Sequence, residues 1–195
     1  MRPTINLLLS GVGGQGVVLA SYVLSQMAMS EGCDVKQSEV HGMSQRGGSV
    51  ISHFRFGDKI SSPIITPGTA DILLGFESLE ALRYVHWLKP DGMLVYNRLQ
   101  INPSPVAAGL AKYPPDIDEQ ITAAWSNTRS VNANELAQQA GTIKAANVVM
   151  LGAVSGALPF ASEGWEKVIR QVVPPKTVEV NLAAFHLGAE TVATS

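Results

Sequence analysis

The sequence is poor in cysteine, in charge and in aromatic residues, and these shortages exclude several classes of protein. Only one of its 195 residues is a cysteine, Cys33, so the chain has no internal disulfide and no iron–sulfur cluster held by four of its own cysteines. No His/Cys spacing resembles a zinc site. Charged residues make up 15% of the chain and give a net charge of -2, so no general basic field exists to hold nucleic acid.

Long hydrophobic runs are missing as well. No uninterrupted apolar stretch reaches the roughly 18 residues that a transmembrane helix needs. The short apolar run at residues 5–9 leads into glycines rather than a cleavage site of small residues, so we do not expect a signal peptide. We expect a cytoplasmic protein that does not bind membranes. Since 46% of the residues are still hydrophobic, the low charge favours a subunit that another chain partly covers.

What the sequence does contain is a regular succession of short aliphatic runs and longer helical patterns. Strands are expected at residues 5–9, 34–39, 70–76, 93–97 and 129–132. Helices are expected at residues 14–31, 77–88, 117–125, 134–140, 145–158, 163–172 and 177–193. This alternation indicates an α/β fold with an open, mostly parallel, doubly wound sheet and C-terminal helices. We expect a single domain over residues 1–195.

Two segments depart from this alternation. The stretch SVISHFRFGDKISSPII predicts a β-hairpin or a pair of antiparallel edge strands, with a turn at Gly57 and Asp58. There His53 and Arg55 would be exposed edge residues, or would extend the basic side of a nearby crevice. Residues 99–115 include four prolines, which predicts a surface loop inside the domain.

Glycines are concentrated where the first predicted strand meets the first predicted helix. The segment GVGGQG satisfies the pattern G-x-G-x-x-G at Gly11, Gly13 and Gly16, with Gly14 and Gln15 between them. Such glycines permit a tight turn and let backbone N–H groups and the helix dipole approach an anion. The motif predicts a site for a phosphate-bearing ligand. The alternative is that the glycines serve only strand–helix packing.

The same glycine pattern also occurs in NAD-binding proteins. There an acidic residue is expected at the end of the second strand, about 20 residues further on. In this sequence Lys36 and Gln37 stand between Asp34 and Glu39 in that neighbourhood. The spacing therefore does not favour NAD.

A second polar, glycine-rich stretch, EVHGMSQRGGSV, follows the second predicted strand. Its Arg46 can pair bidentately with a phosphate or a carboxylate. The residues expected to contribute to a binding site are Ser44, Gln45, Arg46, Gly47, Gly48 and Ser49. Because ligands bind at the carboxyl edge of doubly wound sheets, we expect this loop and the glycine turn to face each other across one crevice. The alternative is a solvated connection in which Arg46 pairs with a surface carboxylate.

Two further residues are candidates for the site or for an interface. His41 could donate a proton or contact a partner chain. Glu77 begins a predicted helix, where a carboxylate interacts favourably with the helix dipole. Capping is therefore its first explanation, and a ligand or interface role is the second. No pair of nucleophile and base stands out, so we assign no catalytic residue and no metal ligand.

Four segments together resemble a known family: GVGGQGVVLAS, SEVHGMSQRGGSV, ADILLGFESLEALR and KAANVVMLGA. In this order they are similar to the gamma-type subunit of the 2-oxoacid:ferredoxin oxidoreductases. The resemblance covers nearly the whole chain and thins after Phe160. The wording MSQRGG resembles the beta subunit of the indolepyruvate branch of that family.

The resemblance implies one subunit of a larger enzyme, inactive alone. Such enzymes decarboxylate a 2-oxoacid on thiamine diphosphate, pass two electrons through iron–sulfur clusters to ferredoxin, and release an acyl-CoA. The clusters need more cysteines than this chain has. The thiamine motif of these enzymes is Gly-Asp-Gly, whereas here Lys59 follows Gly57 and Asp58. Both cofactors would therefore be held by a large partner subunit.

By the same analogy this chain would form the coenzyme A (CoA) side of the site. We expect backbone N–H groups of residues 13–16, with Gln15, to hold a phosphate of CoA. Arg46, supported by Ser44, Gln45 and Ser49, would bind CoA or meet the partner subunit. The other interpretation is a stand-alone nucleotide-binding or NAD-binding protein of the same fold class.

Overall fold

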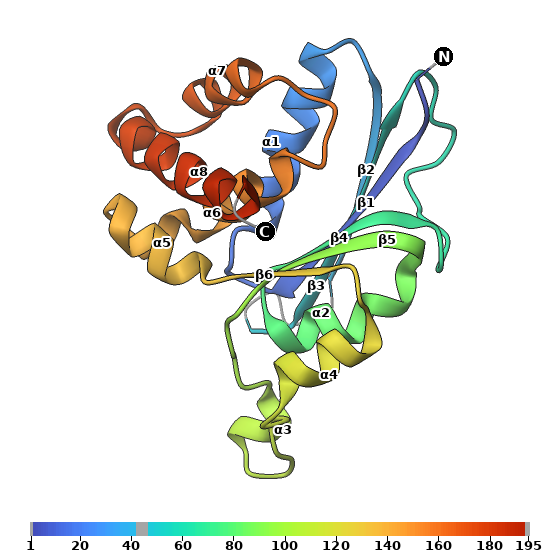
Figure 1. The fold of residues 1–195 in the computed structure, drawn as a ribbon, viewed down its shortest axis with the longest axis vertical. Coiled ribbons are helices and arrows are strands. Elements are labelled where there is room, and N and C mark those ends of the chain that lie inside the picture. Colours follow the sequence, from blue (N-terminus) through green and yellow to red (C-terminus); the bar gives the residue numbers. More distant parts are fainter. Residues whose placement is uncertain (1, 42–46, 194–195) are drawn as a thin grey trace.

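The computed structural model describes residues 2–41 and 47–193, and within them six strands form one sheet in the order β2-β3-β1-β4-β5-β6 (Figure 1). The strands are β1 (Ile5–Val12), β2 (Asp34–His41), β3 (Ser49–Gly57), β4 (Ala70–Gly75), β5 (Leu88–Asn97) and β6 (Thr128–Val131). The pairs β1–β4, β4–β5 and β5–β6 are parallel. Only β3 runs the other way, antiparallel to both β1 and β2. The sheet is thus open and mostly parallel, as expected.

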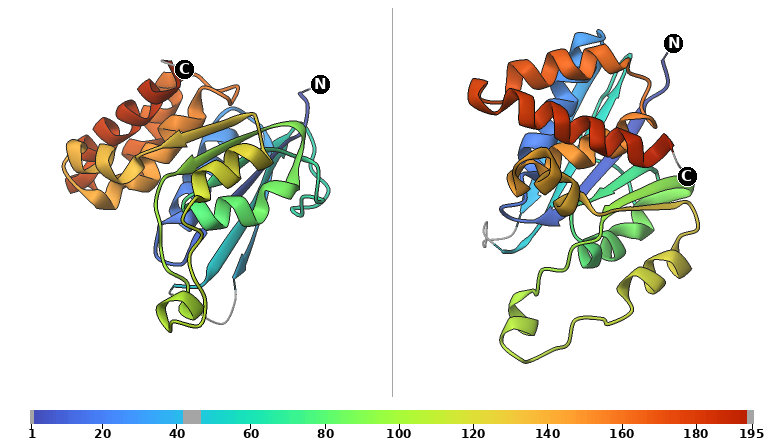
Figure 2. Two further views of the ribbon diagram at one scale, coloured as in Figure 1. Left: turned by 60° about the horizontal axis from the view of Figure 1, so that its bottom comes forward. Right: turned by 60° about the vertical axis from the view of Figure 1, so that its left-hand side comes forward.

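Helices cover both faces of the sheet (Figures 1 and 2). One face carries α1 (Val17–Ser30), α5 (Ala133–Ala140), α6 (Ala146–Ser155), α7 (Ser162–Val172) and α8 (Val178–Ala193). The other carries α2 (Ser78–Tyr84) and α4 (Ile117–Ala124). The remaining helical turns are α3 (Ser104–Ala107), η1 (Val85–Trp87), η2 (Ile143–Ala145) and η3 (Pro175–Thr177). No helix in the described ranges has both the length and the apolar character needed to span a membrane.

The aliphatic run of β1 is explained by these two layers. Leu7 and Leu9 point into the larger core beneath α1 and the C-terminal helices. Leu8, between them, points into the smaller core beneath α2 and α4. Since successive side chains of a strand point to opposite faces, a strand covered on both sides must be apolar at every position.

The sequence predicts an antiparallel pair within residues 49–65, whereas the structure forms this pair from β2 and β3. Residues 49–65 supply one strand, β3, whose hairpin partner is β2, and the turn expected at Gly57 and Asp58 forms no hairpin. Because β1 pairs with the other side of β3, His53 and Arg55 are not edge residues. His53 is only 2% exposed, and the Nε of Arg55 donates to Asn6 Oδ1 at 2.8 Å. Polar alternation could not show that β3 has a neighbour on both sides.

The second helix is shorter and the fifth strand longer than the sequence predicted. The α-helix ends at Tyr84, and β5 already begins at Leu88. Its first residues, which include Pro90, lie where the pairing of β5 with β4 is irregular. Proline is tolerated in a strand where the ladder is interrupted, which is why Lys89 and Pro90 mark the strand rather than the stop of a helix.

Candidate functional site

The glycine turn and the polar loop lie side by side. The Gly13 N–H donates to Gly48 O at 2.8 Å, and the Gly47 N–H donates to Gly13 O at 3.2 Å. These two bonds extend the ladder in which Val12 pairs with Ser49. Pairing of β1 with β3 therefore brings the two segments together at the carboxyl end of β1.

Part of the predicted site lies outside the described residues. This holds for Ser44, Gln45 and Arg46 and for the side chain of His41, whose backbone ends β2. Their roles stay predictions. Gly47 is the first described residue after this segment, and it has a φ of 76°.

Three of the turn's glycines have distinct structural reasons. A Cβ at Gly11 would lie 2.9 Å from both Gln15 Oε1 and Val17 Cγ2. Gly16 has a φ of 78°, and its Cβ would lie 2.6 Å from Asn147 Nδ2. Gly14 also has a positive φ, but the space beside it is open. Packing thus accounts for Gly11 and Gly16, while Gly14 keeps a left-handed backbone at an accessible position.

The side chain of Gln15 is used inside the turn. Its Oε1 accepts the Val12 N–H at 2.7 Å, and its Nε2 donates to Phe76 O at 2.7 Å. Both ends of the amide are therefore engaged, and the side chain joins the turn to the end of β4. The sequence predicts that Gln15 helps to hold a ligand, and that role stays a prediction. In the structure its amide shapes the turn.

The start of α1 leaves several hydrogen-bond donors free. Within the described part of the chain, the N–H groups of Gly14, Gly16, Val17 and Val18 have no hydrogen-bond partner, and no side chain caps the helix. Asn147, near the start of α6, donates to Gly16 O at 3.3 Å and so fixes the turn from behind. Unpaired N–H groups at a helix N-terminus carry partial positive charge and favour an anion.

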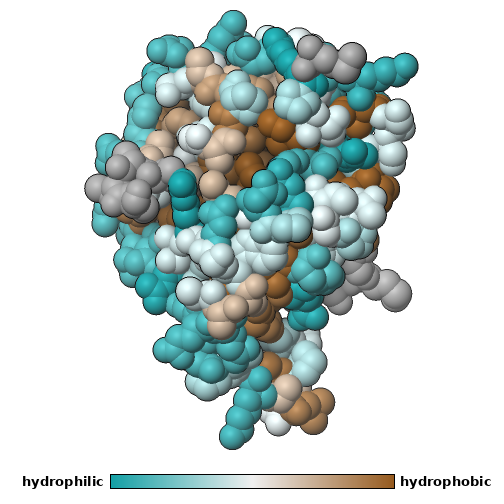
Figure 3. All heavy atoms as spheres, turned by 45° about the vertical axis from the view of Figure 1, so that its right-hand side comes forward, coloured by the Kyte–Doolittle hydropathy of each residue, from teal (hydrophilic) through white to brown (hydrophobic). Residues whose placement is uncertain are grey.

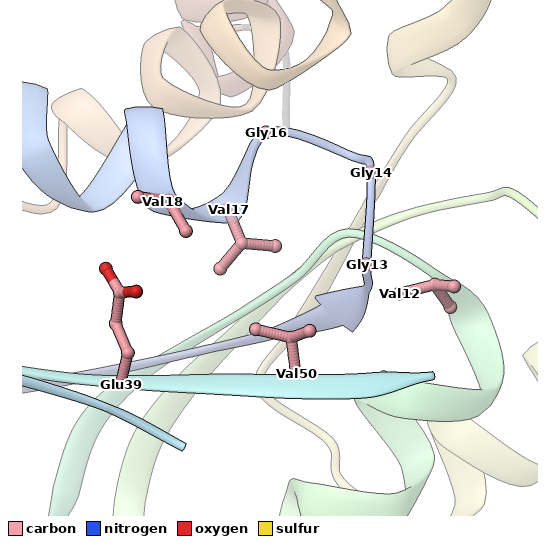
Figure 4. Close-up of a pocket in the computed structure, with 8 residues that line it drawn as sticks. All are labelled: Val12, Gly13, Gly14, Gly16, Val17, Val18, Glu39 and Val50. Carbon is pink, nitrogen blue, oxygen red and sulfur yellow. The ribbon is translucent and has the colours of Figure 1, made fainter. Parts of the chain in front are cut away.

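A cavity of about 490 Å³ opens beside the turn, between the start of α1 and the strands β2 and β3. The described residues that line it are Val12, Gly13, Gly14, Gly16, Val17, Val18, Glu39 and Val50. Figure 4 shows the Glu39 carboxylate on the strand side, opposite Val17 and Val18. The valines suit an uncharged, partly apolar group, and the carboxylate suits a hydroxyl donor better than a phosphate.

A smaller cavity of about 140 Å³ lies on the other side of the turn. It is lined by Gly14, Gln15, Phe76, Asn97, Leu99, Asn134, Ile143, Lys144, Ala146 and Asn147. None of these residues is acidic, and Lys144 has no ion-pair partner among the described residues. The cavity thus offers a cation and amide groups next to the free N–H of Gly14, which is a suitable environment for an anion.

Sequence reasoning missed Lys144 and the asparagines of this cavity. Lys144 and Asn147 lie in the segment KAANVVMLGA, which the sequence marks only as the start of a buried helix and as part of the family resemblance. Asn134 is predicted only as a helix cap, and Asn97 only as the end of a strand. Asn97 is positioned by the fold, since its Oδ1 accepts the Ala133 N–H at 3.0 Å. Contacts between segments so far apart in the chain leave no pattern in the sequence.

Glu77 is a buried structural carboxylate. Its Oε2 accepts the Glu80 N–H at 2.8 Å, which confirms the capping role. Its Oε1 accepts the Tyr113 hydroxyl at 2.6 Å and the Ile101 N–H at 3.1 Å. Burial, together with the neighbouring carboxylate, raises the pKa of Tyr113, so the tyrosine stays protonated as a donor.

A neighbouring carboxylate contacts the polar loop. Glu80 Oε2 accepts the Ser49 hydroxyl at 2.5 Å, and Glu80 Oε1 accepts the Nε of Arg83 at 3.2 Å. Ser49 is therefore held by α2. Within the described ranges no group of three or more His, Cys, Asp or Glu residues is arranged to hold a metal ion.

The strand order does not favour the NAD alternative. In a dinucleotide-binding sheet β2 adjoins β1, so the acidic residue at its end lies beside the glycine turn. Here the antiparallel β3 lies between them. Glu39 does reach the larger cavity, but from one strand further away.

The chain is similar to known proteins over nearly its whole length. Residues 6–191 match the family model described as pyruvate ferredoxin/flavodoxin oxidoreductase. The indolepyruvate oxidoreductase subunit IorB of Thermococcus kodakarensis is 42% identical over 191 residues, covering 95% of this chain and 94% of the relative.

Two solved structures share the fold. A keto/oxoacid ferredoxin oxidoreductase gamma subunit from Geobacter sulfurreducens superposes with a TM-score of 0.72 at 28% identity, covering 98% of this chain and 99% of that one. The 2-oxoglutarate:ferredoxin oxidoreductase of Magnetococcus marinus, solved with 2-oxoglutarate, coenzyme A and succinyl-CoA bound, has a TM-score of 0.76 at 16% identity. It covers all of this chain but only 32% of its own, so there the fold is part of a longer polypeptide.

Proposed function

Because this chain belongs to the pyruvate ferredoxin/flavodoxin oxidoreductase family, we propose that it is a subunit of a 2-oxoacid:ferredoxin oxidoreductase that acts on indolepyruvate or a related aryl pyruvate. The nearly full-length similarity to a subunit named for indolepyruvate supports this substrate class. In this proposal a larger partner subunit holds thiamine diphosphate and the iron–sulfur clusters, and ferredoxin accepts the electrons. The single cysteine of this chain agrees with that division.

The role proposed for this chain is to bind CoA beside the partner's thiamine centre. One observation carries the proposal: the glycine turn and the polar loop are hydrogen-bonded to each other at the carboxyl edge, beside backbone N–H groups that have no partner among the described residues. Loops at this edge, where the crossover helices change sides of the sheet, usually bind ligands. The Ser49 hydroxyl donates to Glu80, whose carboxylate also accepts from Arg83, so this pair ties the polar loop to α2. In this proposal the chain binds and orients CoA rather than reacting with it.

In this proposal each cavity binds a chemically different part of CoA. A phosphate of CoA would lie at the N–H group of Gly14, next to Lys144. An uncharged part, such as a ribose or the pantetheine arm, would occupy the larger cavity with its valines and Glu39. Arg46, Ser44 and Gln45 would close the crevice from the polar loop or contact the partner subunit.

Reconstitution tests this function. The chain and its large subunit, co-purified, should reduce ferredoxin when given CoA and indolepyruvate, and much more slowly with pyruvate or 2-oxoglutarate. The isolated chain should contain no iron and show no such activity. The proposal is wrong if the chain purifies from its native source as a free monomer that binds NAD at micromolar concentration.

A further inference from the structure

Residues 99–115 form an arm that projects from the body of the molecule between β5 and α4, with α3 at its end (Figures 1 and 2). From residue 104 to residue 112 every side chain except Val106 is exposed, and Leu110 is 83% exposed. The arm's 17 residues include a single charge, Lys112. Figure 3 shows hydrophobic residues at the end of this protrusion. A projecting and nearly uncharged apolar surface is typical of a protein interaction site.

The arm is held in a fixed position at its base. Ile101, in the segment that enters the arm, and Tyr113, in the segment that leaves it, both donate to Glu77 Oε1, at 3.1 and 2.6 Å. Glu77 is only 1% exposed. The N–H of Leu79 donates to the Tyr113 oxygen at 3.2 Å. One buried carboxylate therefore joins both ends of the arm to α2, so the arm is ordered before anything binds it.

The end of the arm has its own hydrogen bonds. The N–H groups of Leu110 and Ala111 donate to Pro105 O at 2.8 and 3.2 Å, and the Ala108 N–H donates to Ser104 O at 2.9 Å. These bonds hold Leu110 at the tip without burying it. An exposed anchor on an ordered support loses little conformational entropy on binding.

The base of the arm also borders the candidate site. A groove of about 220 Å³ has Gly47, Gly48 and Ser49 of the polar loop among its lining residues. The arm contributes Ile101, Pro103, Ser104 and Pro105 to the same groove. A protein that covers the crevice must therefore lie against the arm.

We propose that the arm of residues 99–115 docks the large subunit, with Leu110 inserted into an apolar pocket of that subunit and Glu77 setting the direction of the arm. The inference rests on the proposed function, which supplies the large subunit as the occupant. A second copy of this chain is the competing occupant. The shared groove favours the large subunit, because that subunit must complete the crevice which the base of the arm borders.

The test compares two exposed apolar residues. Purified full-length chain is titrated with the purified large subunit of the same enzyme, and the dissociation constant is measured for wild type, Leu110→Asp and Ile64→Asp. Ile64 is 48% exposed and lies between β3 and β4, at the opposite edge of the sheet from the crevice. We expect Leu110→Asp to weaken binding at least about tenfold, as truncation of an interface anchor does, and Ile64→Asp to change it less than about twofold.

The melting temperature of Leu110→Asp should equal that of wild type, because the side chain is exposed in the isolated chain. The inference is overturned if Leu110→Asp binds like wild type, or if Ile64→Asp weakens binding equally. It is also overturned if the isolated chain is a dimer that Leu110→Asp makes monomeric. If wild type itself binds no large subunit, the proposed function fails, and the inference fails with it.

Discussion

At the scale of single residues, two amide side chains fix the glycine turn, and one exposed cation lies beside it. Gln15 and Asn147 bond to the backbone of the glycine turn, so they fix its conformation. Lys144 is the one cationic side chain among the described residues that line the small cavity. The amides therefore fix the geometry of the turn, and in the proposed function Lys144 would contribute to the affinity for a phosphate.

Replacing Lys144 by Gln should weaken CoA binding to the assembled enzyme. A charge-assisted hydrogen bond to a phosphate contributes about 1.5–3 kcal/mol, so the dissociation constant of CoA should rise by roughly 10- to 100-fold. Lys167→Gln, on α7, is the matched control and should leave it unchanged. Isothermal titration of the complex measures both. Equal affinity of wild type and Lys144→Gln would mean that the phosphate does not bind in the small cavity.

Replacing Glu77 by Ala should destabilise the isolated chain. The change leaves the Glu80 N–H, the Ile101 N–H and the Tyr113 hydroxyl without their acceptor. Each unsatisfied buried donor costs about 1–3 kcal/mol, and partial access of water to the arm places the total at about 2–4 kcal/mol. Urea denaturation measures the loss, with the exposed Glu119→Ala as control. A loss no larger than that of the control would show that the carboxylate does not hold the arm.

At the scale of secondary-structure elements, two helices touch through glycines. A Cβ at Gly152 of α6 would lie 2.0 Å from Phe185 O, and one at Gly188 of α8 would lie 2.0 Å from Val149 O. The helix backbones are therefore in direct contact. The sequence predicted both helices, but their glycines gave no sign of which helix they face.

Gly152→Ala should lower the free energy of unfolding, although alanine is the better helix former by about 1 kcal/mol. The obstruction is backbone, so the two helices must separate, and overpacking of this kind costs about 1–3 kcal/mol. Gly164→Ala in α7 is the matched control, because its Cβ would meet only the flexible end of Met27. Thermal and urea unfolding should show a loss for Gly152→Ala and little change or a gain for Gly164→Ala. The reverse order would contradict the close contact of α6 and α8.

At the scale of the whole molecule, the sheet, the segment between β3 and β4, and the turn η1 together bury the imidazole of His53. His53 on β3 is 2% exposed, accepts the Ile65 N–H through Nδ1 at 3.3 Å, and lies 5.3 Å from the ring of Trp87. Burial lowers its pKa from the usual value near 6.5. The folded state therefore contains neutral His53 where the unfolded chain would bind a proton.

This difference makes global stability depend on pH. Above about pH 6.5 His53 is neutral in both states and contributes no pH dependence. As the pH falls below 6.5 the unfolded state gains a proton that the folded state does not, so stability decreases by up to about 1.4 kcal/mol per pH unit until the lowered folded-state pKa is reached. Urea unfolding at pH 7.5 and pH 5.5 should show a smaller pH effect for His53→Gln than for wild type. An equal effect in both would assign the dependence to other groups.

How much of the site could be foreseen follows from the distance in sequence between its parts. The glycine turn and the polar loop each carry a local signal, because glycine and charged residues in a loop have few structural alternatives. Their meeting could be expected from the rule that ligands bind at the carboxyl edge of such sheets. Lys144, Asn97 and Glu39 reach the two cavities from different elements, and no local pattern identifies them. The bonds of Gln15 to Val12 and Phe76 could not be foreseen either, because they depend on where β4 ends.

The sequence by itself determined the α/β class, the mostly parallel sheet, the glycine turn and the lack of enough cysteines to hold an iron–sulfur cluster within this chain. These follow from local periodicity, from glycine conformation and from a cysteine count, all of which are properties of neighbouring residues or of composition. Only the tertiary structure decided that β3 separates β2 from β1, that His53 is buried, that Glu77 anchors the arm, and which side chains surround the turn. Those outcomes depend on which strands pair and which helices pack together, and such contacts are selected by the total free energy of the folded chain rather than by any one segment.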